Sequence, residues 1–358
     1  MAACAAAYFY SQQKGIPRGV ALALLPAFLV ELALYIMPGF AGVRRALAAL
    51  PAAVLALLLS GAAMVPYVLA TVPLGAFHLA SLLAVGAIAA VIAFWYVPLK
   101  DSGSVPPEAG VHRLKSVPPV VQRLAGRWWD RLQPVRHKLT HYPLKPPLAT
   151  DLLFLTVIAA VFLSHAFRTL YPAPARTLPL EVLGRLMWVH TGVIAVLCIR
   201  GLEAGFGFVP QPREWRIGIL LTLCFVPVAA LLGYLLHVAR WHPIIAWSWS
   251  LPVLVLGRFL GVLWVLALAE EFFVRGFLQQ ILSRGLRSET AGIAVTSLIF
   301  GALHLPFGAF PNWRFAALAA TAGLFYGVAF AKTRSIRAPM VMHALVVTAW
   351  QLFFNAHS

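Results

Sequence analysis

Long apolar stretches separated by short polar turns dominate the hydrophobicity pattern of this 358-residue chain. A helix of about 20 apolar residues is long enough to cross a lipid bilayer, and ten segments are candidates for such spans. They are residues 20–37, 46–65, 73–99, 151–170, 183–199, 217–238, 251–282, 291–305, 315–331 and 339–354. The pattern predicts an all-α fold, a polytopic transmembrane helical bundle of about ten spans.

Composition supports a membrane protein, because 61% of the residues are hydrophobic and only 11% are charged. Lysine and arginine number 28 against 11 acidic residues, a formal net charge of +17. In a membrane protein such an excess gathers in cytoplasmic loops and faces anionic lipid, so we expect the lipid bilayer as a partner and no nucleic acid. The alanine- and arginine-rich composition favours a bacterial inner (plasma) membrane. The sequence does not indicate an oligomeric state.

One long polar segment interrupts the apolar pattern. Residues 100–148 are rich in proline and carry nine basic residues against three acidic ones. Such a segment suits an anionic membrane surface, and a solvated basic linker is the alternative. We predict a three-span membrane region at 1–99, a basic cytoplasmic loop at 100–148, and membrane spans leading into the core at 149–250.

Three ionisable side chains, Glu270, Glu271 and Arg275, interrupt the apolar segment 251–282. Ionised groups inside a span are costly unless they face protein or water, so they indicate a functional site by default. Glu271 and Arg275 are four residues apart in the favourable order for an ion pair, which leaves Glu270, about 100° around the helix, free. We interpret Glu270 as a general base that points into a cavity. The alternative is a charge-neutralised network that only fixes helix packing.

Two later spans carry histidines that can reach Glu270. Phe300 and His304 are four residues apart and share a helix face. Glu270 and His304 lie about equally far from the turn between their helices, roughly 25 Å of helix each, so we expect them at similar depth. His343 lies roughly 12 Å along its helix from the basic 332–337 loop. These positions predict one buried pocket that all three side chains share.

Other polar or small residues in the spans have a simpler interpretation. A lone histidine in a span is usually a hydrogen-bonding partner between packed helices, which we expect of His78, His165, His190 and His237. Gly323 and Gly327 form a small-residue surface that predicts close helix packing and nothing more. The three cysteines lie far apart and support neither a disulfide framework nor a zinc ribbon.

Three motifs follow one another in the last third of the chain. They are Glu-Glu-Phe-Phe-Val-Arg-Gly at 270–276, Phe-Gly-Ala-Leu-His at 300–304, and the stretch 327–343 that ends in His343. Together they resemble the motifs of the CAAX prenyl protease and bacteriocin-processing (CPBP, ABI) family. The resemblance implies an intramembrane glutamic-type endopeptidase whose catalytic helical core is residues 251–358, acting on a membrane-associated peptide or protein.

The resemblance also implies roles for the polar residues. Glu270 would take a proton from water, His304 would help to hold that water, and His343 would stabilise the oxyanion that forms on the scissile carbonyl. Glu271 and Arg275 complete the candidate catalytic residues. No cofactor is expected. The alternative is a zinc protease with the same Glu and His ligands, although no H-E-x-x-H pair preorganises them on one helix.

One departure from the family pattern concerns the second oxyanion donor. The family commonly has a polar residue, often asparagine, four positions after the last histidine, where this chain has Val347. Thr348 or a backbone N–H is the candidate replacement, and loss of one donor costs about 100-fold in rate. Val347 also favours a third hypothesis, a non-catalytic membrane protein on a degenerate protease scaffold. The substrate cannot be identified from the sequence.

Overall fold

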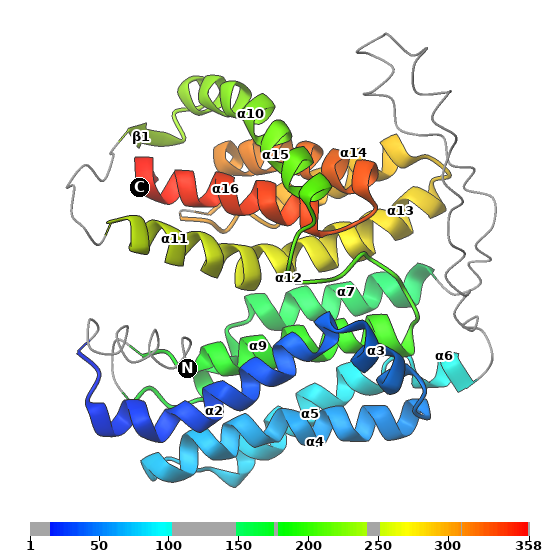
Figure 1. Ribbon diagram of the computed structural model, residues 1–358, viewed down its shortest axis with the longest axis vertical. Coiled ribbons are helices and arrows are strands. Elements are labelled where there is room, and N and C mark those ends of the chain that lie inside the picture. Colours follow the sequence, from blue (N-terminus) through cyan, green and yellow to red (C-terminus); the bar gives the residue numbers. More distant parts are fainter. Residues whose placement is uncertain (1–14, 102–147, 175–177, 242–250, 309, 357–358) are drawn as a thin grey trace. The chain divides into compact units, whose positions relative to one another are not determined.

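The computed structural model describes residues 15–101, 148–174, 178–241, 251–308 and 310–356 (Figure 1). It confirms the helical bundle, because each of the ten predicted spans contains a helix. Within the described residues, seven helical segments are long and apolar enough to cross a membrane. The protein is therefore an integral membrane protein of the all-α class. A short antiparallel ladder between β1 (Ala239–Trp241) and β2 (Phe354–Ala356) is added to the helices.

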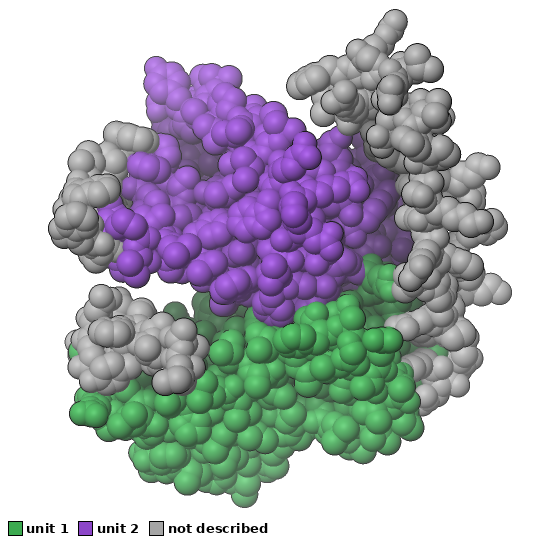
Figure 2. All heavy atoms as spheres, in the orientation of Figure 1, with its two compact units in different colours: residues 1–105, 146–203 green, residues 106–145, 204–358 purple. Residues whose placement is uncertain are grey.

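The chain divides into two compact units (Figure 2). Unit 1 contains residues 1–105 and 146–203, and unit 2 contains residues 106–145 and 204–358. The predicted basic loop at 100–148 lies almost entirely outside the described residues. The division into four functional regions stays a prediction.

Unit 1 is built from helices that pack side by side. Its elements are α2 (Arg18–Ile36), η1 (Met37–Gly39), α3 (Ala41–Ala48), α4 (Ala52–Thr71), η2 (Val72–Leu74), α5 (Leu79–Phe94), α6 (Val97–Asp101), α7 (Leu148–Leu163), α8 (Ala166–Leu170), α9 (Glu181–Ile194) and η4 (Ala195–Ile199). Helix α9 packs against α2, α4 and α5. It is therefore the central helix of this group.

The structure corrects two of the predicted spans in unit 1. The predicted span 46–65 is displaced, because α4 begins after Pro51 and continues through Pro66 to Thr71. A proline inside a membrane helix is tolerated when neighbouring groups satisfy the freed backbone, so Pro66 does not end this helix. The predicted span 151–170 is two helices, α7 and α8, which are separated at His165, where the backbone has a φ of 56°.

Unit 1 also contains two buried polar pairs. Arg200 binds Asp151 through two nitrogen–oxygen contacts of 3.1 Å, and the Tyr96 hydroxyl donates to the same carboxylate at 3.0 Å. His190 Nδ1 lies 2.8 Å from Glu31 Oε1 on another helix. The prediction that His190 is a hydrogen-bonding partner between helices is confirmed. The Arg200–Asp151 pair thus satisfies buried charges that would otherwise be costly in a membrane protein.

Unit 2 contains the predicted catalytic core. Its elements are α10 (Pro212–Leu235), β1, α11 (Leu251–Gly261), η5 (Val262–Ala267), α12 (Leu268–Glu271), η6 (Phe272–Gln279), α13 (Gln280–Gly285), α14 (Glu289–Ala302), α15 (Trp313–Thr333), α16 (Arg337–Phe353) and β2. Residues 251–285 form one continuous helical run, as predicted. Two parts of it, η5 and η6, are π-helical, a wider geometry that often occurs at functional sites.

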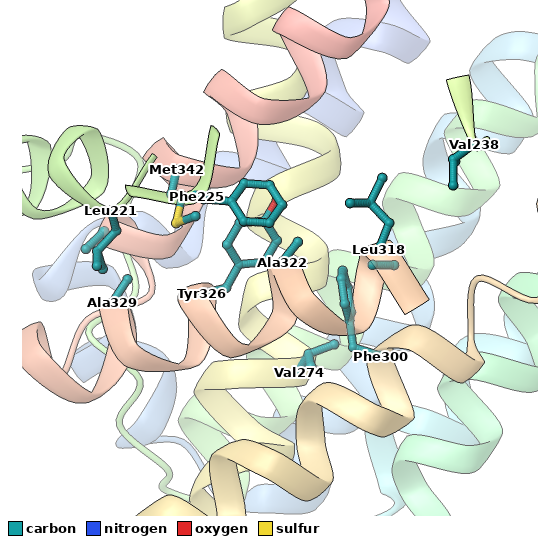
Figure 3. Close-up of a cluster of buried hydrophobic side chains, with 12 residues drawn as sticks. Leu221, Phe225, Val238, Val274, Phe300, Leu318, Ala322, Tyr326, Ala329 and Met342 are labelled. Atoms are coloured by element: carbon teal, nitrogen blue, oxygen red, sulfur yellow. The ribbon is translucent and has the colours of Figure 1, made fainter. Parts of the chain in front are cut away.

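Buried aromatic and aliphatic side chains hold the helices of unit 2 together (Figure 3). The cluster joins Phe225 of α10, Val274 of η6, Phe300 of α14, Tyr326 of α15 and Met342 of α16. Lipid tails are as apolar as these side chains, so their burial alone adds little, and close packing with polar contacts has to supply the stability.

A glycine sets the distance between α10 and α16. A Cβ atom on Gly218 would lie 2.8 Å from the Val341 Cβ and 2.9 Å from the Ala338 carbonyl oxygen. We expect Gly218→Ala to destabilise the protein by about 1–3 kcal/mol, because the two helices would have to separate. Thermal unfolding in detergent measures this.

Gly233→Ala is the matched control on the same helix, because a Cβ atom there meets nothing within 4 Å. Alanine is the better helix former, so this change should leave stability equal or slightly higher. Equal effects of the two substitutions would contradict the proposed close contact.

Candidate active site

The two adjacent glutamates lie at the end of α12, between the two π-helical stretches. They differ in environment, because Glu271 is fully buried whereas 31% of the Glu270 side chain is exposed. Arg275 Nε lies 3.4 Å from Glu271 Oε2, so the predicted ion pair is present. Glu270 is not part of that pair. One carboxylate is therefore fixed by a cation, and the other belongs to a partly exposed side chain.

Arg275 is enclosed by groups that favour a cation. Its guanidinium carbon lies 4.3 Å from the centre of the Phe300 ring and 5.2 Å from that of the Tyr326 ring. Its Nη2 donates to the Gly323 carbonyl oxygen at 3.2 Å. Two aromatic faces, a carbonyl and the Glu271 carboxylate thus hold a buried charge in one position.

The glycines of α15 have a further role beyond the predicted close packing. The carbonyl of Gly323 accepts from Arg275, and one turn later that of Gly327 accepts from Gln279 Nε2 at 3.2 Å. A Cβ atom on Gly327 would lie only 3.0 Å from Gln279 Oε1. The missing side chains allow η6 to approach closely enough for its polar groups to reach the backbone of α15.

His343 of α16 connects the two glutamates. Its Nδ1 lies 2.7 Å from Glu271 Oε1, and its Nε2 lies 3.9 Å from Glu270 Oε2. With Glu271 ionised, its carboxylate only accepts hydrogen bonds, and the Nδ1–H group of His343 is then the donor in this contact. This bond fixes the orientation of the ring, with its second nitrogen toward Glu270.

Aromatic contacts also position the His343 ring. It stacks on Tyr326 with 4.9 Å between ring centres and 13° between ring planes. Phe300 meets it edge-on at 6.2 Å. Tyr326 is almost fully buried and contacts both His343 and Arg275. In the sequence, Tyr326 precedes Gly327 of the small-residue surface, and the pattern there predicts only helix packing.

His304 contacts Phe300 and makes no direct hydrogen bond to the glutamates among the described residues. It follows the end of α14 in a turn, where its Nδ1 lies 2.8 Å from the Phe300 carbonyl oxygen and its ring 4.6 Å from the Phe300 ring. Within the described residues it makes no hydrogen bond to Glu270, Glu271 or His343. The structure thus brings Glu270 and His343 together, and the Phe300 ring contacts both His304 and His343. A pocket shared by all three side chains stays a prediction.

Several polar atoms of this cluster are buried without a hydrogen-bond partner among the described residues. They are Glu270 Oε2, Glu271 Oε2, Arg275 Nε and Arg275 Nη1. The Arg275–Glu271 contact is thus an ion pair without a hydrogen bond. Buried polar atoms that make no hydrogen bond are rare and need an explanation, such as a ligand that they bind.

The predicted replacement for the missing family donor, Thr348, makes no contact with His343 that the described residues show. Thr348 is buried, and its hydroxyl has no hydrogen-bond partner among the described residues. Five residues separate it from His343 on α16, which places it about 140° around the helix. No contact between the two side chains is found in the described part of the chain. Thr348 as an oxyanion donor stays a prediction.

Comparison with known proteins identifies the segment that carries this cluster. Residues 249–349 match the family model described as Rce1-like, type II CAAX prenyl endopeptidase. The matched segment includes all three motifs, so the resemblance inferred from them is confirmed for this part of the chain. No curated protein and no solved structure matches the chain. Unit 1 lies outside the matched segment.

Proposed function

We propose that this protein is an intramembrane endopeptidase that hydrolyses a peptide bond of a membrane-associated protein or peptide. The family match supports protease activity at family level. One observation carries the proposal further: His343 is bound through Nδ1 to Glu271 at 2.7 Å and directs Nε2 to Glu270, 3.9 Å away. A network that only fixed packing would give no reason for a partly exposed glutamate side chain beside an oriented imidazole.

In the proposed reaction, Glu270 is the general base. Its partly exposed carboxylate takes a proton from the water that attacks the scissile carbonyl, and later gives that proton to the leaving amine. His343 donates a hydrogen bond from Nε2 to the oxyanion of the tetrahedral intermediate. Nδ1–H of His304 donates to the Phe300 carbonyl, which leaves Nε2 of His304 to help hold the attacking water.

Glu271 and Arg275 are positioning residues in this scheme. Glu271 orients the imidazole of His343, and Arg275 holds Glu271 in place. When His343 carries both ring protons, the four side chains Glu270, Glu271, Arg275 and His343 sum to zero charge. A neutral cluster is the arrangement that a lipid environment tolerates best.

A comparison of membrane proteomes tests the proposed function and finds the substrate. We propose the bacterial inner membrane as its location, so cells that produce either the wild type or Glu270→Gln are compared there. A substrate should be shortened, with a new N-terminus, only where the carboxylate is intact. Identical proteomes would favour the non-catalytic scaffold, which predicts that every candidate peptide stays intact.

The zinc alternative has less support from the side chains. Within the described residues, no group of three or more His, Cys, Asp or Glu side chains is arranged to hold a metal ion. Glu271 is already bound to His343 and paired with Arg275. We therefore expect chelators to leave cleavage unchanged and metal analysis of the purified protein to find no stoichiometric zinc. Chelator inhibition that added zinc reverses would contradict this prediction.

A further inference from the structure

The outward face of α10 carries a groove that the proposed reaction does not use. Its volume is about 660 Å³, and it is lined by Arg213, Arg216, Ile217, Ile219, Leu220 and Leu223. The opposite face of the helix, which includes Gly218 and Phe225, is buried in unit 2, and α10 packs there against α15 and α16 (Figure 1). The groove therefore faces away from the core of unit 2.

One end of the groove is positively charged. Arg213 and Arg216 are exposed and lie in the first turns of α10, where the helix dipole is also positive. Arg213 uses Nη2 to donate to the Lys332 carbonyl oxygen at 3.0 Å, which leaves its other N–H groups available. The nearby Glu214 is buried and paired with Arg337 at 2.9 Å. Across the described ranges, no carboxylate contacts Arg213 or Arg216.

The rest of the groove is aliphatic and exposed. The exposed fractions are 43% for Ile219, 53% for Leu220 and 65% for Leu223. From Arg213 to Leu223 the groove follows ten residues of helix, roughly 15 Å. Helix α10 is long and apolar enough to span a membrane. The groove thus offers cations next to aliphatic side chains along the same helix face.

We propose that this groove binds an anionic phospholipid. The planar guanidinium groups of Arg213 and Arg216 each present two parallel N–H donors, a geometry that matches phosphate oxygens. One acyl chain of the lipid lies along Ile217, Leu220 and Leu223. A soluble anion would leave this aliphatic wall uncovered, and a zwitterionic lipid would bring a second cation to the arginines. The site does not depend on the proposed proteolysis.

Native mass spectrometry of the full-length protein in detergent tests the proposal, with phosphatidylglycerol and phosphatidylcholine added in turn. We expect the wild type to retain phosphatidylglycerol at least about tenfold better, because each basic residue near an anionic lipid contributes to binding. Arg213→Gln with Arg216→Gln should abolish that preference. The control variant, Arg18→Gln with Arg314→Gln, removes the same charge from exposed positions outside the groove. It should retain the preference for phosphatidylglycerol.

A second pair of substitutions tests the acyl part of the site. Leu220→Asn with Leu223→Asn keeps both arginines and should also weaken the retention of phosphatidylglycerol. Unchanged retention in this variant, or displacement of the lipid by soluble glycerol phosphate, would indicate an anion site and overturn the lipid assignment. Equal retention of the two lipids by the wild type would overturn it as well. If the arginine variant does not fold, the leucine variant and the comparison of the two lipids on the wild type still test whether the groove binds an anionic phospholipid.

Discussion

Substitution of Glu270 by Gln is expected to lower the rate of peptide cleavage by about 10²- to 10⁴-fold. The amide cannot take a proton from water, and a positioned general base contributes up to that factor. Glutamine has nearly the same volume, and the Glu270 side chain is partly exposed, so the protein should stay folded in the membrane. The measurement is the cleavage rate of a substrate peptide by purified protein, with thermal unfolding recorded for each variant.

Glu289→Gln is the matched control for this experiment. Glu289 is the first residue of α14 and forms an ion pair with the half-exposed Arg334 at 2.9 Å. Loss of such a surface pair costs little, so cleavage should continue at the wild-type rate. Full activity of Glu270→Gln would remove Glu270 as the base.

Replacement of Arg275 by Met is expected to destabilise the protein by about 3–5 kcal/mol, the usual cost of removing one partner of a buried ion pair. Glu271 would remain fully buried without its cation, and the Gly323 carbonyl would lose its donor. The Phe300 and Tyr326 rings would also lose the cation that lies over them. The midpoint of thermal unfolding in detergent, with urea titration for the free energy, measures the loss.

Two control variants separate charge from geometry at this position. Arg275→Lys keeps the cation but loses the planar fork, so it should recover part of the stability. Arg314→Met removes an exposed arginine from the start of α15 and should have little effect. Wild-type stability of Arg275→Met would show that the guanidinium does not hold Glu271 in place.

Structural features could be predicted from the sequence where the residues concerned lie on one helix. A helix within each of the ten predicted spans could be predicted because a membrane span needs a long apolar run whose backbone hydrogen bonds are internal. The Glu271–Arg275 pair could be predicted from its four-residue spacing. The ends of helices were less predictable, as Pro66 inside α4 shows, because the neighbouring helices decide whether a proline is tolerated.

Contacts between helices could not be derived in the same way. The bond from His343 to Glu271 joins residues 72 positions apart and depends on how α16 packs beside α12. Depth along each helix placed His343 near the glutamates but did not show which carboxylate it would bind. The same reasoning placed His304 at a similar depth but could not show that its Nδ1 is bound to the Phe300 carbonyl.

Tyr326 was missed for a related reason. In the sequence it is an aromatic residue among small ones, a pattern that indicates helix packing. Only the fold shows that its ring stacks on His343 and faces Arg275. The available signal was the tyrosine itself, because a tyrosine inside a span usually needs a polar group near its hydroxyl.

The chemical role of Glu270 is tested most directly by one turnover in water labelled with ¹⁸O, once the proteome comparison has supplied a substrate peptide. If Glu270 acts as the base, the label enters the new carboxyl terminus of the peptide, and Glu270, analysed by mass spectrometry of the digested protein, stays unlabelled. Incorporation of ¹⁸O into Glu270 would identify it as a nucleophile, and an intact peptide would show that this cluster does not cut. Either result would contradict the proposed activation of water.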